Sequence, residues 1–190
     1  MSHLLPAYLS RLGLDASVAT AAPTPLLLAQ LMAAHSRALP FENLDCVLRR
    51  PVSLHLSDIS SKLLGAAFGA PRRGGYCFEH NSLLSAALSA LGFCVQPLLC
   101  RVRWGKAAGE LPAFTHLALR VAIHSEAFLA DLGFAGTNSQ APVPLGLGGA
   151  STQLPEGAFR AAENATADGY TTLQWEVQGA WRDLYMWRTG

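Results

Sequence analysis

The sequence predicts an α+β protein in which an N-terminal helical half is followed by an antiparallel β half. Two observations support this prediction. Apolar residues recur three and four positions apart through the first ninety residues, which is typical of amphipathic helices. After Gly92 the pattern changes to alternating, β-branched and aromatic residues, which favour strands. We therefore expect two domains, a helical one over residues 1–90 and a β one over residues 91–190.

The first two helices have recognisable start and stop signals. A stripe of leucines and one tyrosine begins at Leu4 and ends at Gly13. The second helix is expected to begin at Thr24-Pro25, because threonine caps a helix and proline suits its first position. Leu39-Pro40 then stops this helix, since a residue before proline disfavours the helical conformation.

Two further helices complete the helical half. Ser57 is expected to cap a short helix whose apolar face includes Ile59 and which Gly65 closes. A longer helix is predicted from about residue 77 to residue 91. Gly92 follows it and provides its C-terminal stop.

The β half is expected to contain strands separated by turns. Ser125-Glu126 lies in a predicted hairpin turn, and the segment Gly133 to Gly149 is so rich in glycine and proline that we expect a loop. The predicted strands cover residues 93–104, 114–123, 127–131, 171–177 and 181–187.

The composition describes a folded protein. Of 190 residues, 51% are hydrophobic and 14% are charged, which excludes a disordered chain. The mean hydropathy is +0.24, yet no apolar run approaches the roughly 18 residues of a membrane span. The net charge is +1 and no basic block is present, which argues against nucleic acid or an anionic membrane as the main partner.

The distribution of cysteine and histidine favours a cytoplasmic protein without a metal. The N-terminus has neither the charged start nor the small-residue cleavage site of a signal peptide. The cysteines form no CxxC pair, so we expect reduced thiols, most of them small core residues. The histidines are scattered, and no metal site is predicted. The cysteines are Cys46, Cys77, Cys94 and Cys100.

One segment, Arg72 to Asn81, carries the features of a nucleophile. Its two adjacent glycines permit a close backbone approach or a positive φ, and they deliver Cys77 to the start of a predicted helix. Unpaired N–H groups and the helix dipole at that position favour a thiolate, which is the nucleophilic form. The alternative is a buried cysteine that opens an ordinary core helix. We interpret Glu79 and His80 as local hydrogen-bonding partners.

A cysteine nucleophile needs a base, and the base needs an orienting group. His116 shares a strand face with Phe114 and Ala118, so it can point inward. Asp131 ends the following strand, and a hairpin would bring it close to His116. Taken separately, His116 is also compatible with a core histidine, and Asp131 with a residue that starts a turn.

The chain resembles the arylamine N-acetyltransferase family in several colinear segments. Residues 73–81, RGGYCFEHN, resemble the nucleophile motif of the family, and residues 39–45, LPFENLD, resemble its upstream segment. Residues 115–116, TH, and 131–134, DLGF, have the order and approximate spacing of the other two members of its catalytic triad. Residues 8–14 are similar to its first helix.

The resemblance implies a helical bundle followed by an antiparallel β-barrel, with a triad arranged as in cysteine proteases. It implies acetyl transfer from acetyl-CoA, the co-substrate, to an aromatic amine or hydrazine through an acetyl-cysteine. Cys77 would be the nucleophile, His116 the base and Asp131 the orienting carboxylate. Phe41 and Phe134 would flank the amine ring, although ordinary core filling explains them equally well.

The same resemblance implies a site for the coenzyme phosphates and an ion pair. The coenzyme loop would include Gly133, Gly136 and Thr137, for which a plain surface loop is the alternative. Arg73 and Glu42 would form a buried ion pair that anchors the nucleophile loop.

Members of this family usually continue beyond this chain's end into a C-terminal lid, which we expect to be missing. An uncovered site would admit water, and uncovered apolar surface would favour a homo-oligomer. The resemblance also leaves open an amide synthase, since the family includes such enzymes with the same residues, and a cysteine thioesterase or hydrolase, since the same triad serves either acceptor. The expected loss of the lid adds a non-catalytic truncated homologue as a third alternative.

Overall fold

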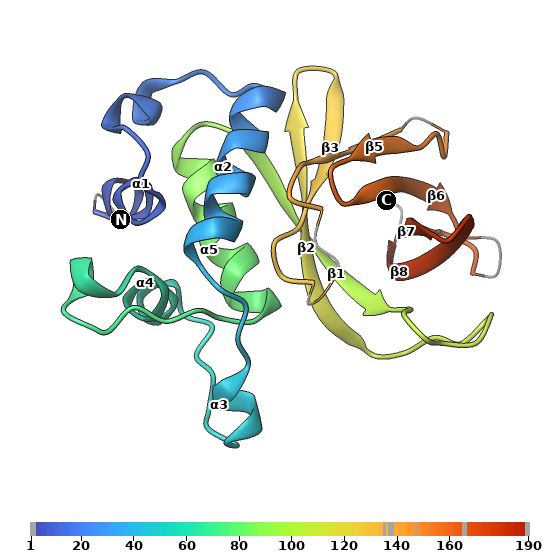
Figure 1. Ribbon diagram of the computed structural model, residues 1–190, viewed down its shortest axis with the longest axis horizontal. Helices are drawn as coiled ribbons and strands as arrows, with labels where there is room; N and C mark the ends of the chain where they lie inside the picture. Colours follow the sequence, from blue (N-terminus) through green and yellow to red (C-terminus); the bar gives the residue numbers. More distant parts are fainter. Residues whose placement is uncertain (1–2, 135, 137–138, 147, 165–166, 189–190) are drawn as a thin grey trace.

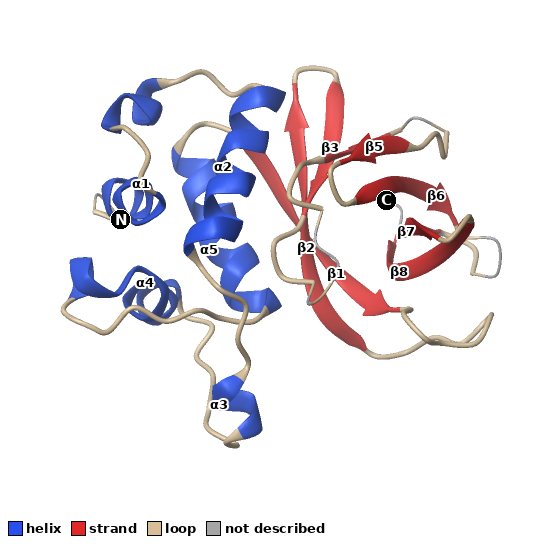
Figure 2. Ribbon diagram, in the orientation of Figure 1, coloured by secondary structure: helices blue, strands red, loops and turns tan. Residues whose placement is uncertain are grey.

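A computed structural model describes the chain except for residues 1–2, 135, 137–138, 147, 165–166 and 189–190. Helices gather at one end of the molecule and a strongly curved sheet forms the other end (Figures 1 and 2). The fold is therefore α+β, as the sequence predicts. The α-helices are α1 (Leu4–Leu12), α2 (Pro25–Ala38), α3 (Leu44–Val47), α4 (Leu56–Leu64) and α5 (Cys77–Ala90), and the 3₁₀ helices are η1 (Ala16–Thr20) and η2 (Gly65–Phe68).

The described strands form one antiparallel sheet in the order β4-β3-β2-β1-β8-β7-β6-β5. The sheet curls until β4 approaches β6, so that it becomes a nearly closed barrel. The strands are β1 (Cys94–Val102), β2 (Phe114–Ile123), β3 (Glu126–Ala130), β4 (Val143–Leu145), β5 (Thr152–Leu154), β6 (Gly157–Glu163), β7 (Tyr170–Val177) and β8 (Ala180–Arg188).

Most predicted helix boundaries are confirmed. Gly13 ends α1 in the left-handed conformation, with φ 68°. The Thr24 hydroxyl accepts a hydrogen bond from Leu27 N at 3.1 Å, and α2 ends before Leu39. The prediction for Ser57 is wrong, because the extended residue at the start of α4 is His55 and Ser57 already lies in the first turn.

Several predictions for short or exposed segments are also wrong. The loop expected over residues 133–149 contains β4, which is held by pairing with β3. The sequence pattern also did not predict α3, β5 and β6, each of which is short or has a weak apolar periodicity. Three cysteines were expected to be small core residues. Of these, Cys100 is buried, whereas Cys46 and Cys94 are exposed.

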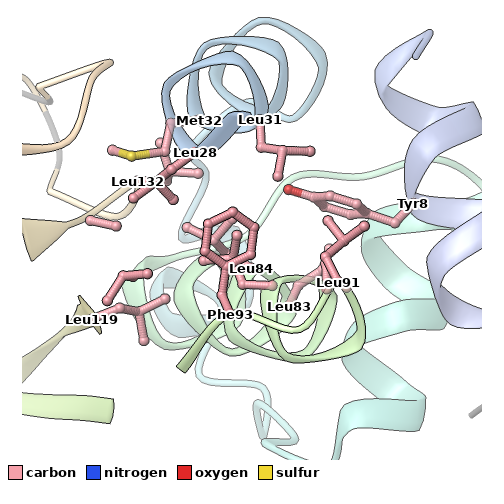
Figure 3. Packing of buried hydrophobic residues seen from close by; sticks show 14 of the residues in the cluster. Tyr8, Leu28, Leu31, Met32, Leu83, Leu84, Leu91, Phe93, Leu119 and Leu132 are labelled. Carbon is pink, nitrogen blue, oxygen red and sulfur yellow. The ribbon is translucent and has the colours of Figure 1, made fainter. Parts of the chain in front are cut away.

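Two apolar cores lie on opposite faces of the sheet. Alternate residues of β2, including Leu119 and Val121, pack against the helices, whereas Ala118 faces the barrel interior. Figure 3 shows the first core, in which Tyr8 of α1 approaches residues of α2 and α5. Because α5 lies against β2 in this core, its first residue, Cys77, contacts Thr115 at the beginning of that strand. The proposed division into domains at residues 90 and 91 stays a prediction.

Candidate active site

Cys77 is the first residue of α5 and is only 8% exposed. The backbone of Tyr76 is extended, and its N–H donates to the Glu79 carboxylate at 3.1 Å, which fixes the start of the helix. The Cys77 thiol faces the backbone carbonyl of Thr115 at 3.8 Å. The nucleophile predicted from the sequence is therefore held at the junction of α5 and β2.

The glycines before Cys77 are required for close packing. A Cβ atom on Gly74 would lie 1.9 Å from the carbonyl oxygen of Pro40, and one on Gly75 would lie 2.9 Å from the Cβ of Glu79. Neither glycine has a positive φ. Of the two explanations that the sequence allowed, the structure therefore supports close backbone approach.

His116 and Asp131 meet across the hairpin of β2 and β3. His116 Nε2–H donates to Asp131 Oδ2 at 2.7 Å, and both side chains are buried. Pairing of Leu119 with Ala130 sets this geometry, since Asp131 follows β3 directly. The hydrogen bond occupies Nε2 and leaves Nδ1 as the ring nitrogen available to the Cys77 thiol.

The protonation states of this pair are coupled. Burial disfavours the imidazolium, but the charge of Asp131, its hydrogen bond and a further hydrogen bond with Cys77 together raise the pKa of His116 to about 9. Burial opposes ionisation of Asp131 as well. The charge and hydrogen bond of His116, helped by Gly133 N–H and the Asn81 amide, nevertheless hold the pKa of Asp131 below its ordinary value. The pair is therefore suited to hold a proton on the imidazole.

Asn81 was not singled out in the sequence, yet it joins the pieces of the site. Its amide nitrogen donates to Asp131 Oδ1 at 2.8 Å and to the Leu117 carbonyl at 2.6 Å. Its amide oxygen accepts from Leu132 N–H at 3.1 Å. Asn81 lies one helical turn after Cys77, and that spacing within the nucleophile segment was the available signal.

Aromatic rings surround the imidazole. The ring of Phe134 meets that of His116 edge-on, with centroids 5.4 Å apart. Tyr185 of β8, which the sequence gave no reason to select, is fully buried with its ring centroid 4.7 Å from that of His116. Phe41 is 39% exposed, and its backbone pairs with Gly75, two residues before Cys77. The structure thus brings both predicted aromatic residues to the site.

The predicted coenzyme residues differ in their surroundings. A Cβ atom on Gly133 would lie 2.3 Å from the Cα of Cys77, so the absence of a side chain lets this loop lie directly against Cys77. The N–H of Gly133 already donates to Asp131 Oδ1 at 2.8 Å. Gly136 is exposed with φ 90°, and Thr137 lies outside the described residues. Their role toward a coenzyme stays a prediction.

The predicted ion pair is part of a larger network. Arg73 Nη2 lies 2.8 Å from Glu42 Oε1 and 3.0 Å from Asp45 Oδ2. Lys62 joins this network through Asp45 and Glu79, both at 2.8 Å. The Arg73 side chain is 37% exposed, so the pair is not buried as expected. Nothing in the sequence pattern linked α4, which carries Lys62, to the nucleophile loop.

His80 has partners beyond the local ones predicted from the sequence. Glu79 does bond locally to Tyr76, whereas His80 contacts two partners that are distant in sequence. Its Nδ1 lies 2.8 Å from His35 Nε2, and its Nε2 lies 3.2 Å from the Pro40 carbonyl oxygen. His80 also bonds to the backbone of Gly75 within its own segment, so the predicted local contact is present beside the two distant ones.

Comparison with known proteins identifies the family to which this fold belongs. A family model described as N-acetyltransferase matches residues 26–190, which include Cys77, His116 and Asp131. The chain belongs to the arylamine N-acetyltransferase family.

Curated arylamine N-acetyltransferases match the whole chain but are longer. The enzyme of Mycolicibacterium smegmatis is 40% identical over 194 residues, which cover 100% of this chain and 66% of the relative. The arylamine N-acetyltransferase / N-hydroxyarylamine O-acetyltransferase of Salmonella typhimurium is 37% identical and covers 100% and 63%. This chain thus spans about two thirds of the length of these curated relatives.

Solved arylamine N-acetyltransferase structures share the fold. The Salmonella typhimurium protein superposes with a TM-score of 0.87 at 37% identity, over 98% of this chain and 64% of that one. The Mycobacterium marinum protein, solved in complex with CoA, gives a TM-score of 0.82 at 34% identity, over 98% and 65%. These neighbours confirm the predicted family and the α+β fold class.

Within the part of the chain that the structure describes, no three His, Cys, Asp or Glu side chains gather so as to hold a metal ion. None of the described helices combines the length and apolar character needed to cross a membrane.

Proposed function

We propose that this chain transfers the acetyl group of acetyl-CoA to an aromatic amine or hydrazine through an acetyl-cysteine at Cys77. The main support for the proposal is that Cys77, His116 and Asp131 are buried and bonded in series. The Cys77 thiol, at the start of α5, bonds to the His116 imidazole, and the imidazole bonds to the Asp131 carboxylate. Membership of the arylamine N-acetyltransferase family supports the same reaction.

In the first half-reaction, the Cys77 thiolate attacks the thioester carbonyl of acetyl-CoA. A new S–C bond forms, the bond between the carbonyl carbon and the CoA sulfur breaks, and the acetyl group remains on Cys77. The departing CoA thiolate takes a proton from the His116 imidazolium. Asp131 stabilises that imidazolium before the transfer and keeps Nδ1 directed at the sulfur.

In the second half-reaction, the acceptor nitrogen attacks the acetyl-cysteine. A C–N bond forms while the C–S bond to Cys77 breaks, and His116 accepts the proton that the nitrogen loses. This returns the thiolate and imidazolium for another cycle. Exchange of one thioester for another is nearly balanced in energy, so the acetyl-cysteine can persist until an acceptor arrives.

The residues around the sulfur suit a flat acceptor. Phe134 packs on His116, and Phe41 lies beside Gly75, so aromatic surface is available on two segments next to the nucleophile. We propose that the acceptor ring binds against these side chains. We further propose that the loop with Gly133, Gly136 and Thr137 lies near the coenzyme. The CoA complex of the Mycobacterium marinum relative supports CoA as the carrier.

The dependence of CoA release on the amine tests the proposal. CoA and acetylated amine are quantified by chromatography with acetyl-CoA, with and without an arylamine. We expect CoA and acetylarylamine to form in equal amounts, and Cys77→Ala to abolish both. Cys46→Ala is the matched control, because it removes an exposed thiol and leaves both products unchanged. CoA release at the same rate without amine would instead indicate a hydrolase.

A further inference from the structure

A hydrogen-bonded chain of three buried side chains runs from the helical core to the edge of the active site. The Tyr8 hydroxyl lies 2.9 Å from His35 Nδ1, His35 Nε2 lies 2.8 Å from His80 Nδ1, and His80 Nε2 lies 3.2 Å from the Pro40 carbonyl oxygen. Tyr8 and His35 are 0% exposed and His80 is 1% exposed. These hydrogen bonds therefore connect α1, α2 and α5 with the segment that follows α2.

The carbonyl at one end fixes the direction of every bond. The Pro40 oxygen can only accept, so His80 Nε2 carries a hydrogen and donates it. The neutral His80 ring then accepts at Nδ1 from His35 Nε2–H, and His35 Nδ1 accepts from the Tyr8 hydroxyl. Burial, the main cause, lowers the pKa of both histidines, which agrees with neutral rings. A single tautomer of each histidine ring thus satisfies every hydrogen bond from Tyr8 to Pro40.

His80 holds the Phe41 segment in two ways. Its Nε2–H binds the carbonyl of Pro40, the residue before Phe41, and its ring stacks on that of Phe41 with an interplanar angle of 9° and centroids 6.4 Å apart. The same segment is bound to the nucleophile loop, because Gly75 N–H donates to Pro40 and Glu42 N–H donates to Gly75. His80 lies one turn after Cys77, so one helix places both the nucleophile and this support.

We propose that His80 is a positioning residue that fixes Phe41 as a wall for an aromatic acceptor, and that His35, bonded in turn to Tyr8, donates to His80 Nδ1 while His80 Nε2–H binds Pro40. The inference rests on the proposed function, since Phe41 contacts an acceptor only if an arylamine binds there. The proposal predicts that the protein selects flat aromatic acceptors through hydrogen-bonded side chains that do not themselves contact the acceptor.

Two variants separate the hydrogen bonds of His80 from its bulk. His80→Leu retains an apolar side chain but cannot bond to Pro40 or His35. His80→Gln provides an amide N–H for Pro40 and an amide oxygen for His35. The acetyl-enzyme is formed with p-nitrophenyl acetate, and its discharge is then measured with an arylamine series and with hydroxylamine, which has no ring to position.

We expect His80→Leu to raise the KM for arylamines about ten- to a hundredfold while discharge by hydroxylamine stays unchanged. His80→Gln should restore the parent KM to within about threefold. In a Phe41→Ala background, His80→Leu should have no further effect on the KM, because it acts through Phe41. Equal losses with arylamine and hydroxylamine, or an undiminished effect without Phe41, would overturn the proposal.

If no acetyl-enzyme forms, that result counts against the proposed function alone. Amide hydrogen exchange still tests whether His80 positions the Phe41 segment. We expect His80→Leu to speed exchange at Gly75 and Glu42, whose N–H groups bind within this segment, while exchange at Leu84 in the core of α5 stays unchanged. His80→Gln should exchange like the parent. Unchanged protection of Gly75 and Glu42 in His80→Leu would show that His80 does not hold the segment.

Discussion

At the scale of single residues, Asp131 is the group on which the protonation of the site depends. One oxygen binds His116 and the other accepts from Asn81 and Gly133, so neither faces solvent freely. The carboxylate thus supplies both the charge that stabilises the imidazolium and the bond that orients it. Its replacement by a neutral isostere separates these two contributions.

Asp131→Asn should lower the pKa of His116 from about 9, because the shape is kept and the charge is lost. Acetylation of Cys77 should slow by about 10²- to 10⁴-fold. NMR titration of His116 and single-turnover acetylation measure the two effects. Asp58→Asn, which neutralises an exposed carboxylate on α4, is the matched control and should change neither. An unchanged pKa of His116 in Asp131→Asn would contradict the coupling.

The residues of the site were predicted to different extents. Cys77, His116 and Asp131 were selected together because a nucleophile segment and a hairpin each carry a local pattern, and the structure brings them together. Asn81 and Tyr185 were not selected, since their importance arises from contacts with strands distant in sequence. A single sequence contains no record of such contacts.

At the scale of secondary structure elements, Asn81 fastens α5 to the hairpin of β2 and β3. Asn81→Ala removes hydrogen bonds to Leu117, Leu132 and Asp131 in a buried place. We expect a loss of about 2–3 kcal/mol in the free energy of unfolding, measured in urea. Ser82→Ala, at the next and half-buried position of α5, should cost less than about 0.5 kcal/mol. Equal losses in the two variants would refute this role.

The elements that the sequence predicted well are those with internal signals. β2 was predicted with its observed bounds, and α2 with its Thr24 cap, because apolar periodicity and capping are local properties. In contrast, β4 has three residues and exists through pairing with β3, so its own composition indicates a loop. Pairing between distant segments stabilises such strands, and local pattern does not reveal it.

At the scale of the whole molecule, buried histidines give the folding stability a maximum near neutral pH. His35 and His80 have lowered pKa values, so their contribution is present above the unfolded value of about 6.5 and is lost as pH falls below it. His116 has a raised pKa of about 9, so its contribution is present below about 6.5 and is lost as pH rises toward 9.

Urea unfolding at pH 5, 6.5 and 9 should therefore give the highest stability at pH 6.5. Measured in Cys77→Ala, where Asp131 still supports the imidazolium but the contribution of Cys77 is lost, the decline from pH 6.5 to 9 should be on the order of 1–2 kcal/mol. Adding His116→Gln should reduce this alkaline decline and leave the acid decline in place. If the alkaline decline persists in full without His116, the pair with Asp131 is not its cause.

Whole-molecule organisation was predicted in part. The change of pattern at Gly92 predicted the order of helices and strands, whereas the closure of the sheet came from the family resemblance, because the β4–β6 approach depends on curvature that no residue pattern encodes. The cores on the two faces of β2 join helices and sheet into one arrangement around the Cys77 site.

The most direct test of the account is the mass of the intact protein after brief incubation with acetyl-CoA. The account predicts one acetyl adduct, absent from Cys77→Ala, present in Cys46→Ala, and removed when an arylamine is added. Folded parent protein that gains no acetyl group, or that gains the same adduct in Cys77→Ala, would contradict the assignment of Cys77 as the nucleophile.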